Sequence, residues 1–344
     1  MSNSRHLPYL VGAASTDITP PLEVGLLMSS VEGRWAPFEG VRLPLMARAL
    51  FITHGETQVA LVSLDLLGLE STSVDGFDRF KERIVAEADF VVRPHELLIA
   101  STHTHTAPES IGLTDLCETE AFRHWIERLA HSIGQAVRRA ARHAVPARLV
   151  LGADRAPELC LHRRIRTRRG ILLSHPMPPA DIILPGTGPV DDSVNVALFL
   201  GADDRPVAIL VNATSHPVNE MCLPFVSPDY PGELCNRLVQ EFGCEALFLN
   251  GAAGNINPPT VSAGPGAAQA HAARLHRAVL AAEERAVASR TAGLQLLQQT
   301  LELPARATRR ADRSTSRFRP TSPSCELVTR RSPSCRANRS SKPA

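Results

Sequence analysis

The chain has 344 residues, of which 37 are Lys or Arg and 35 are Asp or Glu, so its formal net charge is only +2. This balance hides two unlike parts. Residues 305–344 hold ten Arg and one Lys against Asp312 and Glu326, which gives +9, so the other 304 residues sum to −7. The charge therefore excludes a nucleic-acid-seeking body, and no apolar run is long enough to span a bilayer.

Targeting and redox signals predict a protein with reduced cysteines and no export signal. The first ten residues contain Arg5, His6 and Pro8, and no apolar segment follows them, so we expect no secretory signal. The seven cysteines show no CxxC or other paired spacing. We therefore expect free thiols and a cytoplasmic protein.

Hydrophobic periodicity predicts strands and helices that alternate along the body. We expect strands over 45–53 and 58–67, a helix over 71–88, a strand over 96–100 and a helix over 118–143. A loop-rich segment over 152–190 follows, then strands over 194–200 and 207–213, a helix over 230–242, a strand over 246–249 and an Ala-rich helix over 266–290. This interleaving predicts an α/β domain, and no internal repeat is visible.

The chain changes character near its C-terminal end. We expect a domain over 9–304 and a disordered tail over 305–344, because the tail is Arg, Ser, Thr and Pro without hydrophobic periodicity. One interpretation of the tail is a basic arm for nucleic acid or anionic lipid. The other is an out-of-frame translation or truncated product, which the abrupt change after Pro304 favours.

The first polar segment that follows a predicted strand is 101–108, Ser-Thr-His-Thr-His-Thr-Ala-Pro. In an extended chain His103 and His105 point to one side, and such a pair can bind one metal ion. The neighbouring threonines supply hydroxyls that could orient the rings. The alternative is a pair of ordinary polar loop histidines.

Two further polar segments follow predicted strands. His216 lies in 212–217, Asn-Ala-Thr-Ser-His-Pro, where it is either a ligand or a structural histidine, and Asp229 downstream is either a carboxylate ligand or a helix N-cap. Residues 250–259 are rich in Gly, Asn and Pro, which predicts an oxyanion hole or anion nest, or else a plain turn.

The three segments together indicate a site. In α/β sheets, sites form beyond the carboxyl ends of strands, and each segment lies at such an end. Imidazoles with oxygen ligands suit Zn²⁺. The residues by themselves therefore predict a metal-assisted hydrolase.

These segments, in this order, resemble the neutral (neutral/alkaline, non-lysosomal) ceramidase family. The matching residues include Val11-Gly12 with 17–20 Asp-Ile-Thr-Pro, 47–49 Ala-Arg-Ala, 62–65 Val-Ser-Leu-Asp, the His-x-His signature, 162–164 His-Arg-Arg and the Gly254–Pro258 loop. The resemblance covers roughly 9–260. It implies mixed β-sheet layers flanked by helices, of the neutral ceramidase N-terminal-domain type.

The resemblance also implies a zinc-dependent hydrolase of linear amides in sphingolipid or other lipid metabolism. The matching positions make His103 and His216 zinc ligands, while His105 assists the reaction beside the metal and Arg163 holds the reacting groups. Gly254 and Asn255 form the loop at the oxyanion. Asn257 stands where the family has an active-site Ser, and Asn255 stands where it has Asp, which puts ceramide itself in doubt as the substrate.

The family's remaining zinc ligands, a Glu and a Tyr, have no counterpart in this chain. The alternatives to an active enzyme are therefore a truncated, inactive remnant and a binding protein that uses its basic tail. A small-molecule or lipid amide is the expected partner, without nucleic acid for the body and without a transmembrane segment.

Overall fold

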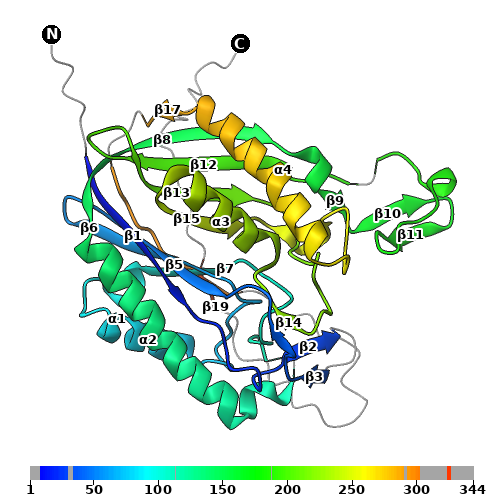
Figure 1. Ribbon diagram of the computed structural model, residues 1–344, viewed down its shortest axis with the longest axis horizontal. Helices are drawn as coiled ribbons and strands as arrows, with labels where there is room; N and C mark the ends of the chain where they lie inside the picture. The colour runs from blue at the N-terminus through cyan, green and yellow to red at the C-terminus, as the bar shows by residue number, and fades with distance from the viewer. Residues whose placement is uncertain are drawn as a thin grey trace, which may run out of the picture. The chain divides into compact units, whose positions relative to one another are not determined.

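Four layers of secondary structure, two facing sheets between two pairs of helices, make up the chain as far as Leu294 (Figure 1). The computed structural model describes residues 8–29, 34–112, 114–186, 188–289, 293–302 and 324–326. One path of hydrogen-bonded strands, β15-β13-β12-β8-β1-β5-β6-β7, folds back at β8 so that its two ends face each other. This confirms the predicted mixed sheet layers flanked by helices.

The first sheet comprises β1 (Tyr9–Asp17), β5 (Met46–His54), β6 (Thr57–Leu64) and β7 (Leu97–Ser101). Its pairs are antiparallel except β6–β7, which is parallel. Helices α1 (Phe77–Glu87) and α2 (Glu120–Arg142) cover its outer face. The predicted stripe of α2 is buried there, and consists of Phe122, Ile126, Leu129, Ile133 and Val137.

The second sheet comprises β8 (Val145–Arg155), β12 (Ser193–Leu200), β13 (Pro206–Ala213) and β15 (Glu245–Asn250), and only β13–β15 is parallel. Helices α3 (Asp229–Phe242) and α4 (Pro265–Glu284) pack on it. Helix α3 ends because Gly243 adopts the left-handed conformation, with φ of 67°. Helix α4 stops earlier than the predicted residue 290.

The interior between the two sheets is apolar. Side chains from β1, β5, β8, β12, β13 and β15 fill it, namely Tyr9, Val11, Leu50, Ala147, Phe199, Ala208 and Leu247. Because both faces of each sheet are covered, the strands consist of nearly continuous apolar residues. This agrees with the apolar strands predicted over 207–213 and 246–249.

Strand β8 was not predicted, and the loop-rich interpretation of 152–190 is wrong for several short pieces. Residues 145–155 contain Pro146 and Gly152, which are rare inside strands. Pairing with β1, β12 and β17 overrides this low propensity. The short strands within 152–190 are β9 (Leu161–His162), β10 (Arg164–Thr167) and β11 (Gly170–Leu173).

The remaining elements of the first unit are short. They are β2 (Leu26–Ser29), β3 (Arg34–Ala36), β4 (Gly40–Val41), β14 (Phe225–Val226), β16 (Ile256–Asn257), β17 (Val287–Ala288) and the 3-10 turns Pro94–Glu96, Asp115–Glu118, Pro157–Leu159, Ala180–Ile182 and Ala253–Asn255. Cys117, Cys160, Cys222, Cys235 and Cys244 are free thiols, as predicted. Along the described residues, no helix combines the length and the apolarity needed to cross a membrane.

A second unit begins at Gln295. Its described residues form the strand pair β18 (Thr300–Glu302) and β19 (Ser324–Glu326). Apart from 324–326, the tail from 305 lies outside the described residues, so its predicted disorder stays a prediction. The predicted domain 9–304 stays a prediction.

Candidate metal centre

The three polar segments predicted at strand ends meet at one place. They follow β7, β13 and β15, and backbone hydrogen bonds join them. The His105 amide donates to Pro217 O at 3.3 Å, the His216 amide donates to Ile256 O at 3.0 Å, and the Gly251 amide donates to Ala213 O at 2.9 Å. The site therefore lies where one end of the first sheet meets the corresponding end of the second.

Three histidines form the centre of this site. One ring nitrogen each of His103, His105 and His216 lies within 4.8 Å of the others, and His105 Nε2 is 3.1 Å from His216 Nε2. The ring centroids are 4.7 to 5.0 Å apart. His103 and His105 are partly exposed, and His216 is buried.

Backbone carbonyls fix the orientation of two of the rings. His103 Nδ1 lies 2.6 Å from Leu67 O, and His216 Nδ1 lies 3.0 Å from Ala253 O. A carbonyl oxygen only accepts, so each Nδ1 carries the proton and each Nε2 keeps its lone pair for a ligand. Among the described residues, no hydrogen bond holds His105 Nδ1, and since His216 Nε2 carries no proton, the contact of 3.1 Å between the two Nε2 atoms has His105 Nε2 as the donor.

A turn of the backbone, and not an extended strand as predicted, brings His103 and His105 together. Strand β7 ends at Ser101, and His103 has φ of 74°, in the left-handed region. The His103 amide donates to Leu66 O at 2.9 Å, which holds this turn. Such a conformation costs a non-glycine residue about 1 kcal/mol or more, and strained residues of this kind cluster at functional sites. The expectation of a shared face on an extended strand is therefore wrong, although the rings do meet.

The three imidazoles are neutral at physiological pH. Burial is the main cause, because it disfavours the charged form. It lowers the pKa of His103, that of His105 to about 3 and that of His216 to about 4. The positive charge of Arg163 lowers all three pKa values further. Neutral imidazole is the form that binds metal ions.

The loop predicted at the oxyanion lies next to Arg163. Strand β16 pairs with β9, and the Arg163 amide donates to Asn255 O at 2.7 Å. Arg163 Nη1 lies 3.4 Å from Gly254 O. The structure thus brings together the predicted residues Arg163, Gly254 and Asn255.

Asn257 and Asn255 already have partners within this loop. Asn257 is buried, and its Nδ2 lies 3.2 Å from Ser174 Oγ and 3.4 Å from His175 Nδ1. Asn255 Nδ2 lies 3.2 Å from His162 Nε2. Their amides hold the loop against the segments on either side of β10–β11.

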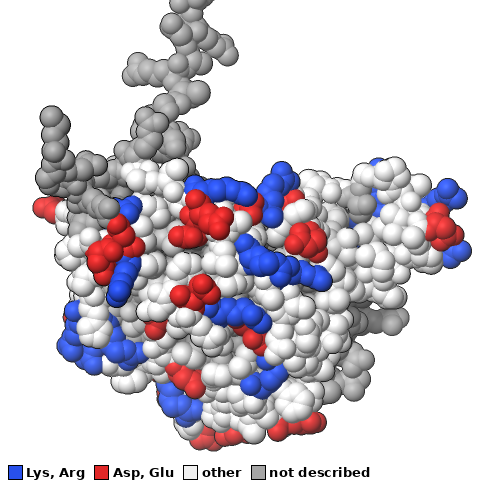
Figure 2. Space-filling model, turned by 45° about the horizontal axis from the view of Figure 1, so that its top comes forward, with Lys and Arg blue, Asp and Glu red and all other residues white. Residues whose placement is uncertain are grey.

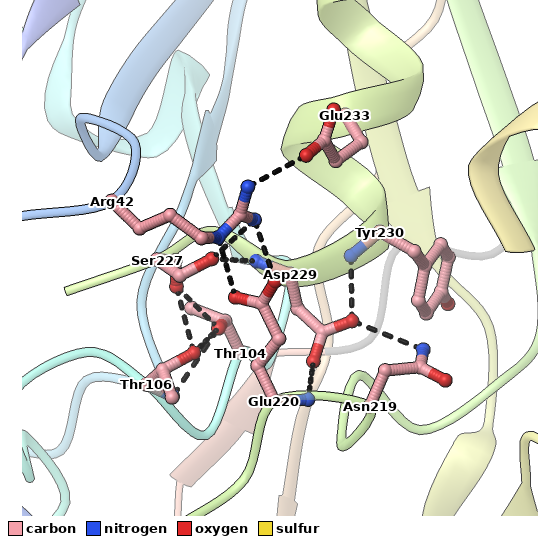
Figure 3. A network of polar contacts seen from close by, with 9 residues as sticks. All are labelled: Arg42, Thr104, Thr106, Asn219, Glu220, Ser227, Asp229, Tyr230 and Glu233. Atoms are coloured by element: carbon pink, nitrogen blue, oxygen red, sulfur yellow. Dashed lines mark hydrogen bonds and ion pairs between the residues drawn. The ribbon is translucent and has the colours of Figure 1, made fainter. Parts of the chain in front are cut away.

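The signature threonines do not orient the histidine rings, contrary to expectation. The Thr104 and Thr106 hydroxyls donate to Ser227 O at 2.8 and 3.0 Å (Figure 3). Ser227 Oγ in turn accepts from Arg42, which also pairs with Glu220 and Glu233. This buried network fixes the backbone on both sides of His105, which is a less direct form of positioning.

Asp229, the alternative carboxylate ligand, and the neighbouring Tyr230 make structural contacts. Asp229 is the first residue of α3, and its carboxylate accepts from the Tyr230 amide at 2.6 Å, the Glu220 amide at 2.9 Å and Asn219 Nδ2 at 3.1 Å (Figure 3). Burial nevertheless raises its pKa to about 6. The Tyr230 hydroxyl donates to Ser215 O at 2.6 Å. Both polar groups are therefore engaged by other parts of the chain, and Asp229 does not belong to the imidazole cluster.

Sequence reasoning missed the residues that support the ligands. The carbonyls of Leu67 and Ala253 are backbone groups, so no side-chain pattern marks them. Asn250 Nδ2 lies 3.1 Å from both Thr102 O and Ser215 O, the carbonyls just before His103 and His216. An Asn at the last residue of a strand, beside a Gly-rich loop, was the available signal.

The donor set fits zinc. Two neutral imidazoles present lone pairs to a common point with their other nitrogen anchored, which is the usual support for a zinc-bound histidine. A third imidazole lies beside them. Within the described residues, no carboxylate or thiol joins this cluster.

Comparisons with known proteins identify the fold. No family model and no curated protein matches the chain. Among solved structures, a ceramidase complexed with C2 superposes with a TM-score of 0.65 and 21% identity over 85% of this chain and 46% of that one. Neutral ceramidase from Pseudomonas aeruginosa superposes with a TM-score of 0.66 and 20% identity over 86% and 48%.

The protein therefore has a neutral ceramidase-like α/β fold, as the sequence motifs predicted. The chain spans about half the length of these two structures. At this level of identity the likeness concerns the fold.

Proposed function

We propose that the protein is a zinc-dependent hydrolase of a linear amide, with N-acylsphingosine or a related N-acyl lipid amide as substrate. The observation that carries the proposal is the cluster of three neutral imidazoles at the strand ends of a neutral ceramidase-like fold. His103 and His216 would hold the metal, because a carbonyl anchors Nδ1 of each. Bound zinc supplies a Lewis acid that polarises the amide carbonyl and makes water more acidic.

His105 is suited to move the proton. Its Nδ1 is not anchored among the described residues, and its Nε2 lies at the centre of the cluster. Burial lowers its pKa, so the ring is neutral at neutral pH and has a nitrogen lone pair that can accept a proton from an attacking water. It then delivers this proton to the departing amine nitrogen, which completes the hydrolysis.

Arg163 and the adjacent loop are suited to charge stabilisation. The guanidinium lies against Gly254 O and is close enough to lower the pKa of all three imidazoles. A fixed positive charge in this position stabilises negative charge that develops on the amide oxygen. Asn257 has no nucleophilic oxygen, so a water is the required nucleophile.

A second candidate is a zinc-binding protein without hydrolase activity. The observation in its favour is that the described residues contribute only three imidazoles to the cluster, on a chain that spans about half of its structural neighbours. This candidate predicts the same metal content and no turnover.

The test combines metal content with hydrolysis. The purified protein, saturated with zinc, is incubated with short-chain N-acylsphingosine and with N-acyl amino acids, and the released fatty acid is measured. We expect one zinc per chain and hydrolysis that a chelator abolishes and added zinc restores. Zinc binding without hydrolysis of any N-acyl amide would establish the second candidate, and absence of zinc binding would refute both.

A further inference from the structure

The hairpin β10–β11 carries an exposed surface that the proposed chemistry does not use. It projects from the side of the first unit (Figure 1). One face is covered, because Ile165 and Thr167 are buried against the segment around Ile182, and Thr167 forms a β-bridge with Ile183. The Arg168 amide also donates to Ile182 O at 2.8 Å.

The opposite face combines apolar and basic side chains. Cross-strand pairing places Arg164 opposite Leu173 and Arg166 opposite Ile171, and residues directly opposite share a face. Ile171 is 67% exposed and Leu173 is 63% exposed. Met177, just beyond the hairpin, is 48% exposed. Large aliphatic side chains this exposed on neighbouring positions mark an interaction surface.

The charge of this lobe is strongly positive. Residues 163–184 contain five arginines and one acidic residue, Asp181. Among the described residues, Arg164, Arg166, Arg168 and Arg169 form no ion pair, whereas Arg42, Arg138, Arg142, Arg148, Arg155 and Arg285 each do. Figure 2 shows the basic side chains at the end of the projecting lobe.

We propose that this hairpin docks the protein onto an anionic lipid surface. Ile171 and Leu173 would enter the boundary between headgroups and acyl chains, while Arg164 and Arg166 contact lipid phosphates. Interleaved aliphatic and basic residues are complementary to a bilayer, whose acyl chains are apolar and whose headgroups are negatively charged.

The same features disfavour other occupants. A second copy related by a two-fold axis would place like-charged arginines against each other. The chain's own tail is also basic, with ten Arg from 305 onward. Nucleic acid is disfavoured because 163–184 contain no Phe, Trp or Tyr on which bases could stack.

The hairpin lies next to the candidate site. Its two ends, Arg163 and Ser174, are joined by a hydrogen bond of 2.8 Å and contact Gly254 and Asn257 of the candidate site. A docked hairpin would therefore hold the site beside the bilayer in which a lipid amide resides. This role in substrate access rests on the proposed function, whereas the proposed lipid binding does not.

The test is sedimentation of the full chain with vesicles of phosphatidylcholine alone or mixed with phosphatidylglycerol, without substrate. We expect binding to the mixed vesicles. Ile171→Ser with Leu173→Ser should weaken it at least about tenfold through lost apolar burial. Arg164→Gln with Arg166→Gln should weaken it about fivefold for each arginine.

Matched controls separate the hairpin from the basic tail, which is present in every variant. Phe90→Ser, at a side chain 73% exposed, and Arg205→Gln, in the β12–β13 turn, should leave binding unchanged. Unchanged melting temperature of the hairpin variants shows that they fold. Equal binding by hairpin and control variants, no binding by the native chain, or a dimer that the hairpin changes dissociate would each overturn the proposal. Loss of hydrolysis with vesicle binding intact would instead concern the proposed function.

Discussion

The two halves of the sandwich repeat one order of elements and contribute to the site in opposite ways. The first runs β1-β5-β6-α1-β7-α2, and the second runs β8-β12-β13-α3-β15-α4. In each, an antiparallel hairpin is followed by a helix, a parallel edge strand and a long helix. The sequence shows no repeat, so the two halves share a topology without visible sequence similarity.

The difference lies in which strand supplies the histidine. In the first half, His103 follows the edge strand β7, and its carbonyl partner Leu67 follows β6. In the second half, His216 follows β13, and its carbonyl partner Ala253 follows the edge strand β15. One candidate metal ligand with its supporting carbonyl therefore comes from each half, and neither half holds two anchored imidazoles.

The largest effect is expected when either anchored ligand is removed. His103→Ala and His216→Ala should each lower zinc affinity and amide hydrolysis on the order of a thousandfold, because one imidazole cannot hold the metal alone. Equilibrium zinc titration and fatty-acid release measure this. His143→Ala, at an exposed helix end, is the control and should change neither. A tight site in the absence of His216 would mean that the first half binds zinc by itself.

His105 also comes from the first half, but unlike His103 it has no ring nitrogen anchored by a carbonyl among the described residues. His105→Ala should retain most of the zinc and lower turnover about a hundredfold, in the range expected for loss of a proton-transfer group. The measurement is turnover at saturating zinc together with metal content. Loss of zinc comparable to that of His103→Ala would make His105 a ligand.

Equivalent glycines test whether the two halves pack alike. A β-carbon on Gly12 of β1 would overlap Ala140 O of α2, and one on Gly152 of β8 would overlap Ala282 O of α4. Each Gly→Ala change should lower the free energy of unfolding by about 3 kcal/mol through overpacking. Gly266→Ala in α4, where a β-carbon meets nothing, should be neutral or slightly stabilising. Denaturant unfolding measures all three, and a much smaller cost at one of the first two would show unequal packing.

The smallest effect concerns the link between the halves. Asn250 Nδ2 contacts the carbonyls before His103 and His216, so Asn250→Ala should weaken zinc binding about tenfold. Asn195→Ala, at an exposed position of β12, is the matched control. A lower melting temperature with unaltered zinc affinity would give Asn250 a purely structural role.

Much of the fold followed from the sequence, because strongly apolar strands and one clear amphipathic helix set the hydrophobic pattern. Strand β8 could not be predicted, since Pro146 and Gly152 disfavour a strand, and the pairing of Pro146 with β1 and of Gly152 with β12 is a long-range contact. The meeting of His103 with His216 was predictable from strand-end logic. The left-handed turn at His103 and the anchoring carbonyls were not, because they depend on tertiary contacts. The roles of individual site residues and the cytoplasmic location stay predictions.

The central claim is that imidazoles from both halves bind one zinc ion. Zinc-edge X-ray absorption of the zinc-loaded protein, compared with His216→Ala, tests it most directly. We expect a first shell of nitrogen and oxygen, with the outer-shell scattering of at least two imidazoles in the native chain and a weaker imidazole signal in the variant. Sulfur in the first shell, or identical spectra for the two proteins, would contradict the claim.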